Sequence, residues 1–321
     1  MAPISPGRLA RWLRAQRKGE PAPSRVPIAL RTFAGHARFI DQLGRRLRVA
    51  HLTDLHVGRV TPRWIQEGAI ALANAQAPDL FVLTGDFVCH SQMYLEQLED
   101  LLRGLAAPAI GVLGNHDHWS GSREVTRVLE RAGVQVLANA NTVLSIAGEK
   151  LQIVGLDDAY TGHADRARAL RGMRPDLPTI ALSHIAEEAD ALWAAGVPMV
   201  FSGHTHAGQV TLARFHELLL GHVAGHRYLH GLYGDRWGQG VVYVGAGIGA
   251  SVVPFRVGER GKREVALFEL GARPGEREEH HLEQAPMRGR APSERAKARR
   301  AARALRKRAR LDQKSWPREP E

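Results

Sequence analysis

The stretch "PMVFSGHTHAGQ", residues 198–209, decides how this chain is interpreted, because an apolar run ends in a glycine and two closely spaced histidines. An apolar run of this kind is typical of a buried strand. Alternate side chains of an extended segment point to the same side, so His204 and His206 are expected to leave the backbone together. Two imidazoles that point the same way suggest a metal site, and a hydrogen-bonded surface pair is the alternative.

Candidate metal ligands also follow four other apolar runs of the chain. These runs are "VAHLTDLHVG" (49–58), "FVLTGDF" (81–87), "VLGNHDH" (112–118) and "IALSHI" (180–185). In open α/β folds the loops at the carboxyl ends of strands gather into one crevice, so residues far apart in sequence can meet there. Seven candidate ligands result: Asp54, His56, Asp86, Asn115, His184, His204 and His206.

The chemical types in this set predict two divalent cations. A mixture of Asp, His and Asn is intermediate in softness and suits Mn, Fe, Zn or Ni better than an all-oxygen calcium site. One carboxylate can bridge two cations about 3.5–4 Å apart and offset their repulsion. We expect Mn first, with Fe, Zn or Ni as alternatives. Glycines precede three of the motifs and allow close backbone approach: Gly85, Gly114 and Gly203.

Strand-like and helix-like segments alternate between about residues 47 and 270. The helix-like segments are 62–76, 91–104, 122–132 and 186–195. Such alternation predicts an α/β sandwich rather than a barrel of hairpins. We expect three parts: a basic N-terminal segment with an amphipathic helix (1–44), one folded domain (45–271) and a basic, disordered tail (272–321).

The positive charge of the chain lies at its two ends. Residues 288–318 carry a formal charge of +11 and residues 1–48 carry +9, whereas residues 49–287 carry about −7. Because residues 49–287 are acidic, nucleic acid is not favoured as the partner of the folded domain. The N-terminal stretch "ISPGRLARWLRAQRKG" (4–19) has Leu9, Trp12 and Leu13 on one helical face among arginines. It suits an anionic membrane surface, and packing on its own domain is the alternative.

Cysteine usage and hydropathy predict a cytoplasmic protein, and its basic ends predict peripheral binding at the inner membrane surface. The single cysteine, Cys89, excludes an internal disulfide framework and is expected to be a small buried residue. No run approaches about 18 apolar residues, and the N-terminus lacks the apolar core of a secretory signal.

The motifs, taken in order, resemble the signature of the calcineurin-like metallophosphoesterases. They are "DLH", "GD", "GNHD", a single histidine after an apolar strand, and "GHTH", over about residues 47–270. The resemblance implies a four-layer αββα sandwich of two mixed β-sheets flanked by helices. It implies that Asp86 bridges two metal ions, held on one side by Asp54, His56 and His206 and on the other by Asn115, His184 and His204. His116 matches the histidine that contacts the phosphate and assists the leaving group, with Asp117 orienting it.

The activity that this resemblance implies is hydrolysis of a phosphodiester or pyrophosphate bond through attack of a metal-bridging hydroxide. The runs "HTHAGQVTLA", "YLHGLYG" and "VYVGAGIGAS" are similar to a bacterial phosphodiesterase subgroup often tied to membranes. Some members of that subgroup cleave UDP-2,3-diacylglucosamine, so we expect a phosphorylated small molecule or lipid as substrate. Relatives commonly carry a proline and an aspartate soon after the single histidine, whereas this chain reads "SHIAEEAD" (183–190). The alternatives are a nuclease acting on DNA or RNA and a non-catalytic metal-bound scaffold.

Overall fold

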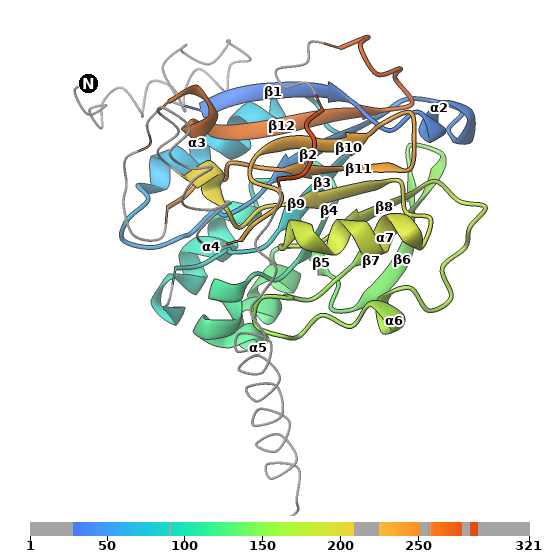
Figure 1. Ribbon diagram of the computed structural model, residues 1–321. Helices are drawn as coiled ribbons and strands as arrows, with labels where there is room; N and C mark the ends of the chain where they lie inside the picture. Colours follow the sequence, from blue (N-terminus) through green and yellow to red (C-terminus); the bar gives the residue numbers. More distant parts are fainter. Residues whose placement is uncertain are drawn as a thin grey trace, which may run out of the picture.

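Two six-stranded mixed sheets form the centre of the protein (Figure 1). The computed structural model describes residues 28–89, 91–208, 225–250, 256, 258–277 and 283–287. The strands of the first sheet, in spatial order, are β1 (Ile28–Ala34), β12 (Arg263–Leu270), β2 (Leu47–Leu52), β3 (Leu80–Thr84), β4 (Ala109–Val112) and β5 (Val134–Val136). Those of the second are β10 (Gly231–Asp235), β11 (Gly240–Val244), β9 (Met199–Ser202), β8 (Thr179–Leu182), β7 (Glu149–Gly155) and β6 (Ala140–Ile146).

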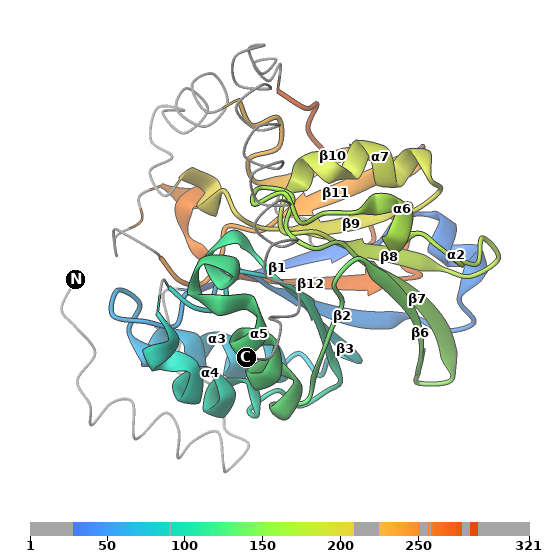
Figure 2. The same ribbon diagram turned by 90° about the horizontal axis from the view of Figure 1, so that it is seen from below.

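Helices cover the outer face of each sheet (Figure 2). The first sheet packs against α3 (Arg63–Asn74), α4 (Leu95–Leu102) and α5 (Asn115–Arg131). The second packs against α6 (Arg166–Ala169) and α7 (Ala189–Ala194). A third apolar cluster fills the space between the sheets, where Val82 of β3 and Leu182 of β8 belong to the same core. The four-layer αββα sandwich predicted from the sequence is therefore confirmed.

The central strands explain the apolar runs of the sequence. All five residues of β3 are buried, because its two faces pack against different layers. Val82 joins the core between the sheets, whereas Phe81 and Leu83 join the core beneath the helices. Strands β2, β3 and β4 run parallel, and so do β7, β8 and β9. Parallel strands place their carboxyl ends at one edge of a sheet, and the candidate ligands follow those ends.

The folded unit extends beyond residues 45–271 at both ends. Strand β1, inside the expected N-terminal segment, pairs with β12 from Ile28↔Arg263 to Ala34↔Glu269, and α2 (Arg38–Gln42) follows it. Inside the expected tail, Gln284 bridges to Tyr233. The expected amphipathic helix and most of the basic tail fall outside the described residues. Among the helices that are described, none is long and apolar enough to cross a membrane.

The expected helices form with shifted boundaries, and one shift concerns the site. Segment 62–76 contains α3, while 91–104 and 186–195 each begin as a 3₁₀ turn, η1 (Gln92–Tyr94) and η2 (Ala186–Glu188), before α4 and α7. Helix α5 starts at Asn115 rather than near residue 122. Gly121, with φ of 109°, interrupts it, so the sequence pattern showed only the later part. The "NHD" motif therefore occupies a helical first turn.

Candidate metal centre

The seven candidate ligands come from five loops at the carboxyl ends of strands. Asp54 and His56 follow β2, Asp86 follows β3, and Asn115 opens α5 after β4. His184 follows β8, and the pair His204 and His206 follows β9. The first three loops belong to the first sheet and the last two to the second. Both sheets thus contribute to one buried cluster.

The backbone at most of these residues is left-handed. The angle φ is positive at five of the seven candidate ligands: 51° at Asp54, 43° at His56, 54° at Asp86, 75° at His204 and 51° at His206. Residues with side chains rarely adopt this conformation, and the strain that it stores concentrates at functional sites. The expectation that His204 and His206 share one side of an extended segment is wrong, because β9 ends at Ser202 and the chain turns.

One group of side chains gathers Asp54, His56 and His206, with potential ligand atoms all within 4.8 Å of one another. The Nε2 atoms of the two histidines face each other at 3.0 Å, and Oδ1 of Asp54 lies 3.3 Å from Nε2 of His206. Oδ2 of Asp54 accepts hydrogen bonds from the hydroxyl of Thr53 and the backbone amide of His204. The outer oxygen is thereby fixed while Oδ1 faces the rings.

A second group gathers Asp86, His184 and His204 within the same limit. Nε2 of His184 lies 3.2 Å from Oδ1 of Asn115 and 3.3 Å from Nδ1 of His204, so Asn115 belongs to this group as well. Oδ2 of Asp86 lies 3.4 Å from Nε2 of His184 and 3.5 Å from Nε2 of His56. This single oxygen therefore faces both groups, which is the position that a bridging ligand requires.

Two glycines let the backbone approach the carboxylates. A Cβ atom at Gly114 would lie 2.3 Å from Oδ1 of Asp86, and one at Gly203 would lie 2.4 Å from Oδ2 of Asp54. Real Cβ atoms do not tolerate such contacts, so both positions require glycine. The close approach also allows a hydrogen bond, in which the backbone amide of His116 donates to Oδ1 of Asp86 at 2.9 Å.

The electrostatics of the cluster favour a bound cation. Burial lowers the pKa of His56 and of His206 to about 3 and that of His204 well below its usual value, which leaves nitrogen lone pairs available. His184 differs, because the carboxylates of Asp86 and Asp54 outweigh burial and raise its pKa to about 10. Its Nδ1 donates to the carbonyl of Thr84 at 2.7 Å, which directs Nε2 toward Asp86.

Unsatisfied buried atoms provide a test of whether a metal fits. Among the described residues, Oδ1 of Asp54 and Nδ1 of His56 are buried without a hydrogen-bond partner. A buried carboxylate oxygen without a donor is costly unless a cation compensates it. Because Oδ1 also faces two imidazole nitrogens, the residues present fit a divalent cation with nitrogen and oxygen ligands.

His116 lies beside the cluster, and Asp117 supports the loops around it. Nε2 of His116 is 3.9 Å from Oδ2 of Asp86. Oδ1 of Asp117 accepts from the backbone amides of Phe87 and Val88, and Oδ2 accepts from that of Gly114. Burial and the charge of Asp86 raise the pKa of Asp117 to about 7, although the amide donors oppose this. Asp117 therefore fixes the loops from which Asp86 and His116 project, and its expected orienting effect on the His116 ring stays a prediction.

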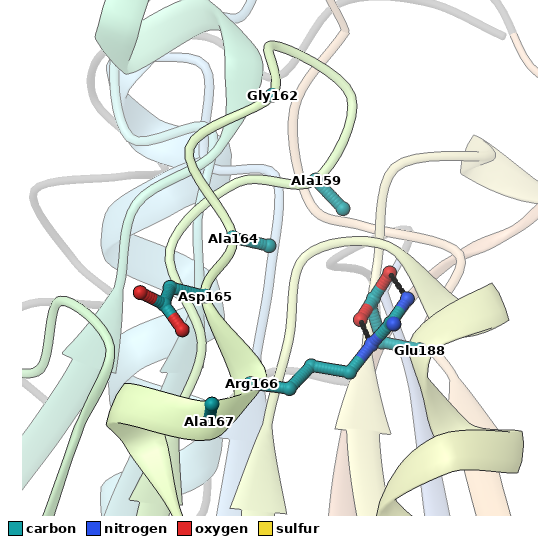
Figure 3. Close-up of a pocket in the computed structure, with 7 residues that line it drawn as sticks. All are labelled: Ala159, Gly162, Ala164, Asp165, Arg166, Ala167 and Glu188. Carbon is teal, nitrogen blue, oxygen red and sulfur yellow. Dashed lines mark hydrogen bonds and ion pairs between the residues drawn. The ribbon is translucent and has the colours of Figure 1, made fainter.

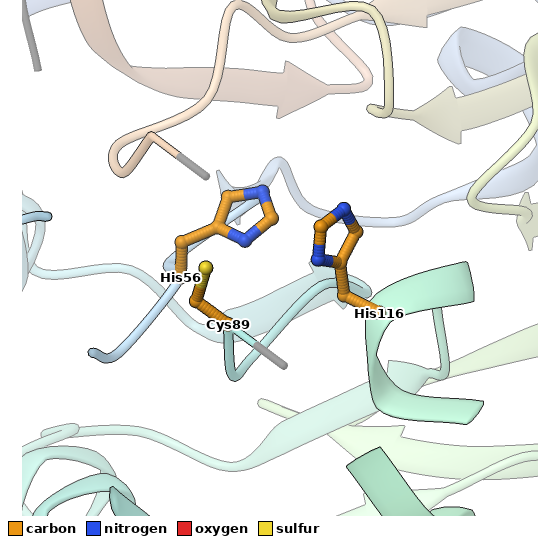
Figure 4. Close-up of side chains that lie close together, drawn as sticks. All are labelled: His56, Cys89 and His116. Atoms are coloured by element: carbon orange, nitrogen blue, oxygen red, sulfur yellow. The ribbon is translucent and has the colours of Figure 1, made fainter. Parts of the chain in front are cut away.

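Two neighbours of the cluster were not expected from the sequence. Cys89 is partly exposed rather than buried, and its thiol lies within 4.8 Å of ring nitrogens of His56 and His116 (Figure 4). Nη2 of Arg256 donates to Nδ1 of His206 at 3.1 Å. A cation on Nε2 of that ring would require the proton to move to Nδ1, so this contact with Arg256 must then open. Neither residue belongs to a motif, so only their spatial position reveals them.

A pocket lies on the loop after β7 (Figure 3). It is lined by small residues and by Arg166, whose guanidinium forms a two-point ion pair with the carboxylate of Glu188. Because that cationic group is already neutralised, the pocket offers no evident anion site. None of the candidate ligands lines it, so the chemistry is assigned to the buried cluster.

Comparisons with known proteins identify the family of this chain. The family model for the calcineurin-like phosphoesterases matches residues 47–208. The phosphodiesterase YaeI of Escherichia coli is 30% identical over 229 residues, which cover 70% of this chain and 82% of that protein. The uncharacterized metallophosphoesterase YkuE of Bacillus subtilis is 31% identical, with 70% of this chain and 78% of that protein covered.

A third relative is named for a pyrophosphate substrate. The UDP-2,3-diacylglucosamine pyrophosphatase LpxG of Chlamydia trachomatis is 27% identical over 217 residues, which cover 52% of this chain and 65% of that protein. The family match spans the five loops that carry the candidate ligands. This chain therefore belongs to the calcineurin-like phosphoesterases, a family of metal-dependent phosphoric ester hydrolases with a dinuclear divalent metal centre.

Proposed function

We propose that this chain hydrolyses phosphodiester or pyrophosphate bonds with two divalent cations bound in the buried cluster. One cation would be held by Asp54, His56 and His206, the other by Asn115, His184 and His204, with Asp86 between them. The observation that carries this assignment is the position of Oδ2 of Asp86, 3.5 Å from His56 and 3.4 Å from His184.

The side chains around the cations have separate roles in this proposal. Bound cations would supply Lewis-acid chemistry, which polarises a phosphoryl oxygen and lowers the pKa of water. The side chain of His116, partly exposed beside Asp86, would contact the phosphoryl group and assist departure of the leaving oxygen. Asp117 would keep His116 in place through the first turn of α5.

The proposed substrate is a phosphorylated small molecule or lipid with a diester or pyrophosphate linkage. Support comes from the relatives named as a phosphodiesterase and as a UDP-2,3-diacylglucosamine pyrophosphatase. We propose Mn as the preferred metal, since the mixed nitrogen and oxygen ligands suit it, and Fe, Zn or Ni as alternatives. We further propose that the protein works in the cytoplasm, at an anionic membrane surface reached through its basic ends.

A substrate panel with added Mn tests the reaction. Bis-p-nitrophenyl phosphate should be hydrolysed with a higher kcat/KM than p-nitrophenyl phosphate, and a UDP-linked lipid should also be cleaved. A clear preference for the monoester would contradict the diester assignment. Faster cleavage of single-stranded DNA than of either would favour the nuclease. No turnover of any substrate, with two metal ions bound per chain, would favour a metal-bound scaffold.

A further inference from the structure

Two exposed aromatic side chains lie beside the candidate metal centre. Trp119 of α5 is 48% exposed, and Tyr160 in the loop after β7 is 54% exposed. Large apolar side chains usually bury such surface, and adjacent exposed ones mark binding sites. These two belong to a small set of exposed large hydrophobic residues in the described parts of the chain, whose other members are Met93, Val143 and Trp237.

The two rings connect the two sides of the centre. The Trp119 ring contacts that of His116, with centroids 4.9 Å apart, and the Tyr160 ring contacts that of His204 at 5.2 Å. Trp119 and Tyr160 meet edge to face, with centroids 6.2 Å apart. An arc of rings therefore runs from the candidate phosphate contact to a candidate ligand of the second cation. We call Trp119 and Tyr160 the aromatic rim.

The rim is held in place by polar contacts between α5 and the loop that carries Tyr160. Nε2 of His118, next to Trp119, lies 2.7 Å from Oδ1 of Asp157. The His118 ring also stacks on that of His163, with centroids 3.9 Å apart and an interplanar angle of 10°. Asn139 accepts from the backbone amide of Asp157 and donates to the carbonyl of His163.

Further contacts fix the turn itself. Oδ2 of Asp158 accepts from the backbone amide of Thr161 at 2.6 Å, one residue after Tyr160. Asp157 and Asp158 thus serve as turn residues. A ring on a fixed backbone loses little conformational freedom when a ligand covers it. The exposed parts of the Trp119 and Tyr160 side chains are therefore suited to contact a ligand.

We propose that the aromatic rim binds a nucleobase on the non-reacting arm of the substrate, which makes a nucleoside-bearing diester or pyrophosphate the preferred substrate class. This inference rests on the proposed function, because it assumes that the phosphate occupies the centre beside His116. A base has a flat π face that stacks on an aromatic side chain, with a gain of about 5-fold to more than 100-fold in affinity. A flexible acyl chain has no such face and loses more conformational freedom on binding.

Binding of three phosphomonoesters to the full-length Mn-loaded protein tests this inference. AMP and ribose 5-phosphate differ by the base alone, and octyl phosphate replaces the nucleoside with an alkyl chain. By isothermal titration calorimetry, AMP should bind at least about fivefold more tightly than ribose 5-phosphate. Trp119→Ala and Tyr160→Ala should each bring this ratio close to one. The Kd of ribose 5-phosphate should change less than about twofold, which also reports that the variants are folded.

Two variants serve as matched controls. Tyr160→Phe keeps the ring and should keep the AMP preference. Trp237 is 62% exposed in the turn between β10 and β11. That turn precedes β11, which runs parallel to β9, so it lies at the sheet edge opposite His204, and Trp237→Ala should keep the preference too.

Three outcomes would overturn the inference. They are a wild-type ratio near one, a ratio unchanged in both alanine variants, and an equal gain for octyl phosphate that both alanine variants remove. Calorimetry does not depend on turnover. A protein that prefers AMP through the rim but fails to hydrolyse bis-p-nitrophenyl phosphate would contradict the proposed function while supporting the rim.

Discussion

Asp86 is the residue on which the two groups of candidate ligands depend. Its Oδ2 faces His56 on one side and His184 on the other, and no described side chain outside the cluster duplicates that position. We expect Asp86→Ala to lose both metal ions or to keep one weakly, because nothing then offsets the repulsion between cations. Elemental analysis after dialysis would measure this, with the exposed Asp41→Ala as control. Two metal ions per chain in Asp86→Ala would make the bridging assignment wrong.

His116 is expected to act on the reaction without holding a cation. Its Nε2 is 3.9 Å from Oδ2 of Asp86, and its own backbone amide, which the substitution preserves, fixes Oδ1 of Asp86. His116→Asn should therefore keep both metal ions and lower kcat by about 10²–10⁴, the range for a positioned acid or charge stabiliser. Steady-state kinetics together with elemental analysis would separate the two effects. An unchanged kcat would remove His116 from the mechanism.

The residues of the candidate site could be predicted from the sequence, but their geometry could not. Only one residue separates His204 from His206, yet they join different groups, and the backbone is left-handed at both, with φ of 75° and 51°. Left-handed backbone at a histidine opposes its intrinsic preference, so only the surrounding structure can impose it. The sequence did not indicate that Cys89, Trp119 and Tyr160 belong near the site, for a related reason. Each lies beside the site only through contacts with residues that are distant in the sequence.

At the scale of elements, Glu264 of β12 links strands from both sheets. Its carboxylate accepts from the hydroxyl of Tyr243 at 2.7 Å and the amide of Ala246 at 2.9 Å, and it pairs with His230 at 3.0 Å and Arg31 at 3.4 Å. Burial raises the pKa of Glu264, but His230 and the hydrogen bonds outweigh burial and hold the pKa below its usual 4.5. The charged form is therefore bound more favourably in the folded state.

This network predicts a pH dependence of stability. Because the folded-state pKa of Glu264 is lowered, its contribution is fully present above about pH 4.5, begins to decrease below that value, and is lost only when the pH falls through the lower folded-state pKa. Glu264→Gln should lower the free energy of unfolding by about 2–4 kcal/mol at pH 7. At pH 3.5, about one unit below the unfolded-state pKa, this loss should be smaller by about 1 kcal/mol. Urea unfolding at both pH values would measure this, with Glu259→Gln, at an exposed partner of Arg31, as control. An equal loss at both pH values would contradict the assignment.

The pairing of β1 shows why the extent of the fold was underestimated. Composition separated residues 1–44 by their basic charge, yet Ile28–Ala34 form an edge strand along β12, more than 200 residues away. Periodicity identifies a strand but not its partner, because pairing depends on the tertiary arrangement. The α/β class could be predicted from the strand-like and helix-like segments that alternate between residues 47 and 270, since βα repeats allow only a few topologies.

At the scale of the whole molecule, positive charge is concentrated outside the described fold. Residues 28–287 carry a formal charge of −3, whereas residues 1–27 carry +5 and residues 288–318 carry +11. The folded part is therefore not expected to be drawn to an anionic surface by itself. Each Lys or Arg near an anionic leaflet contributes about 1 kcal/mol, screened over roughly 8 Å, so half of these charges would give measurable binding.

We therefore expect the full-length protein to bind vesicles that contain anionic lipid, through its basic ends. The apolar side chains of Leu9, Trp12 and Leu13 would add contacts with the lipid, and nucleic acid offers no equivalent apolar phase. In sedimentation assays, binding should weaken as salt is raised and should fall when residues 1–20 or 288–321 are deleted. Neutral vesicles are the control, because they retain the apolar phase but lack the charge. The membrane proposal would be contradicted if the protein failed to bind anionic vesicles but bound DNA or RNA with an affinity that falls steeply as salt is raised. That result would favour the nuclease, since the release of counterions from the nucleic acid then dominates the interaction.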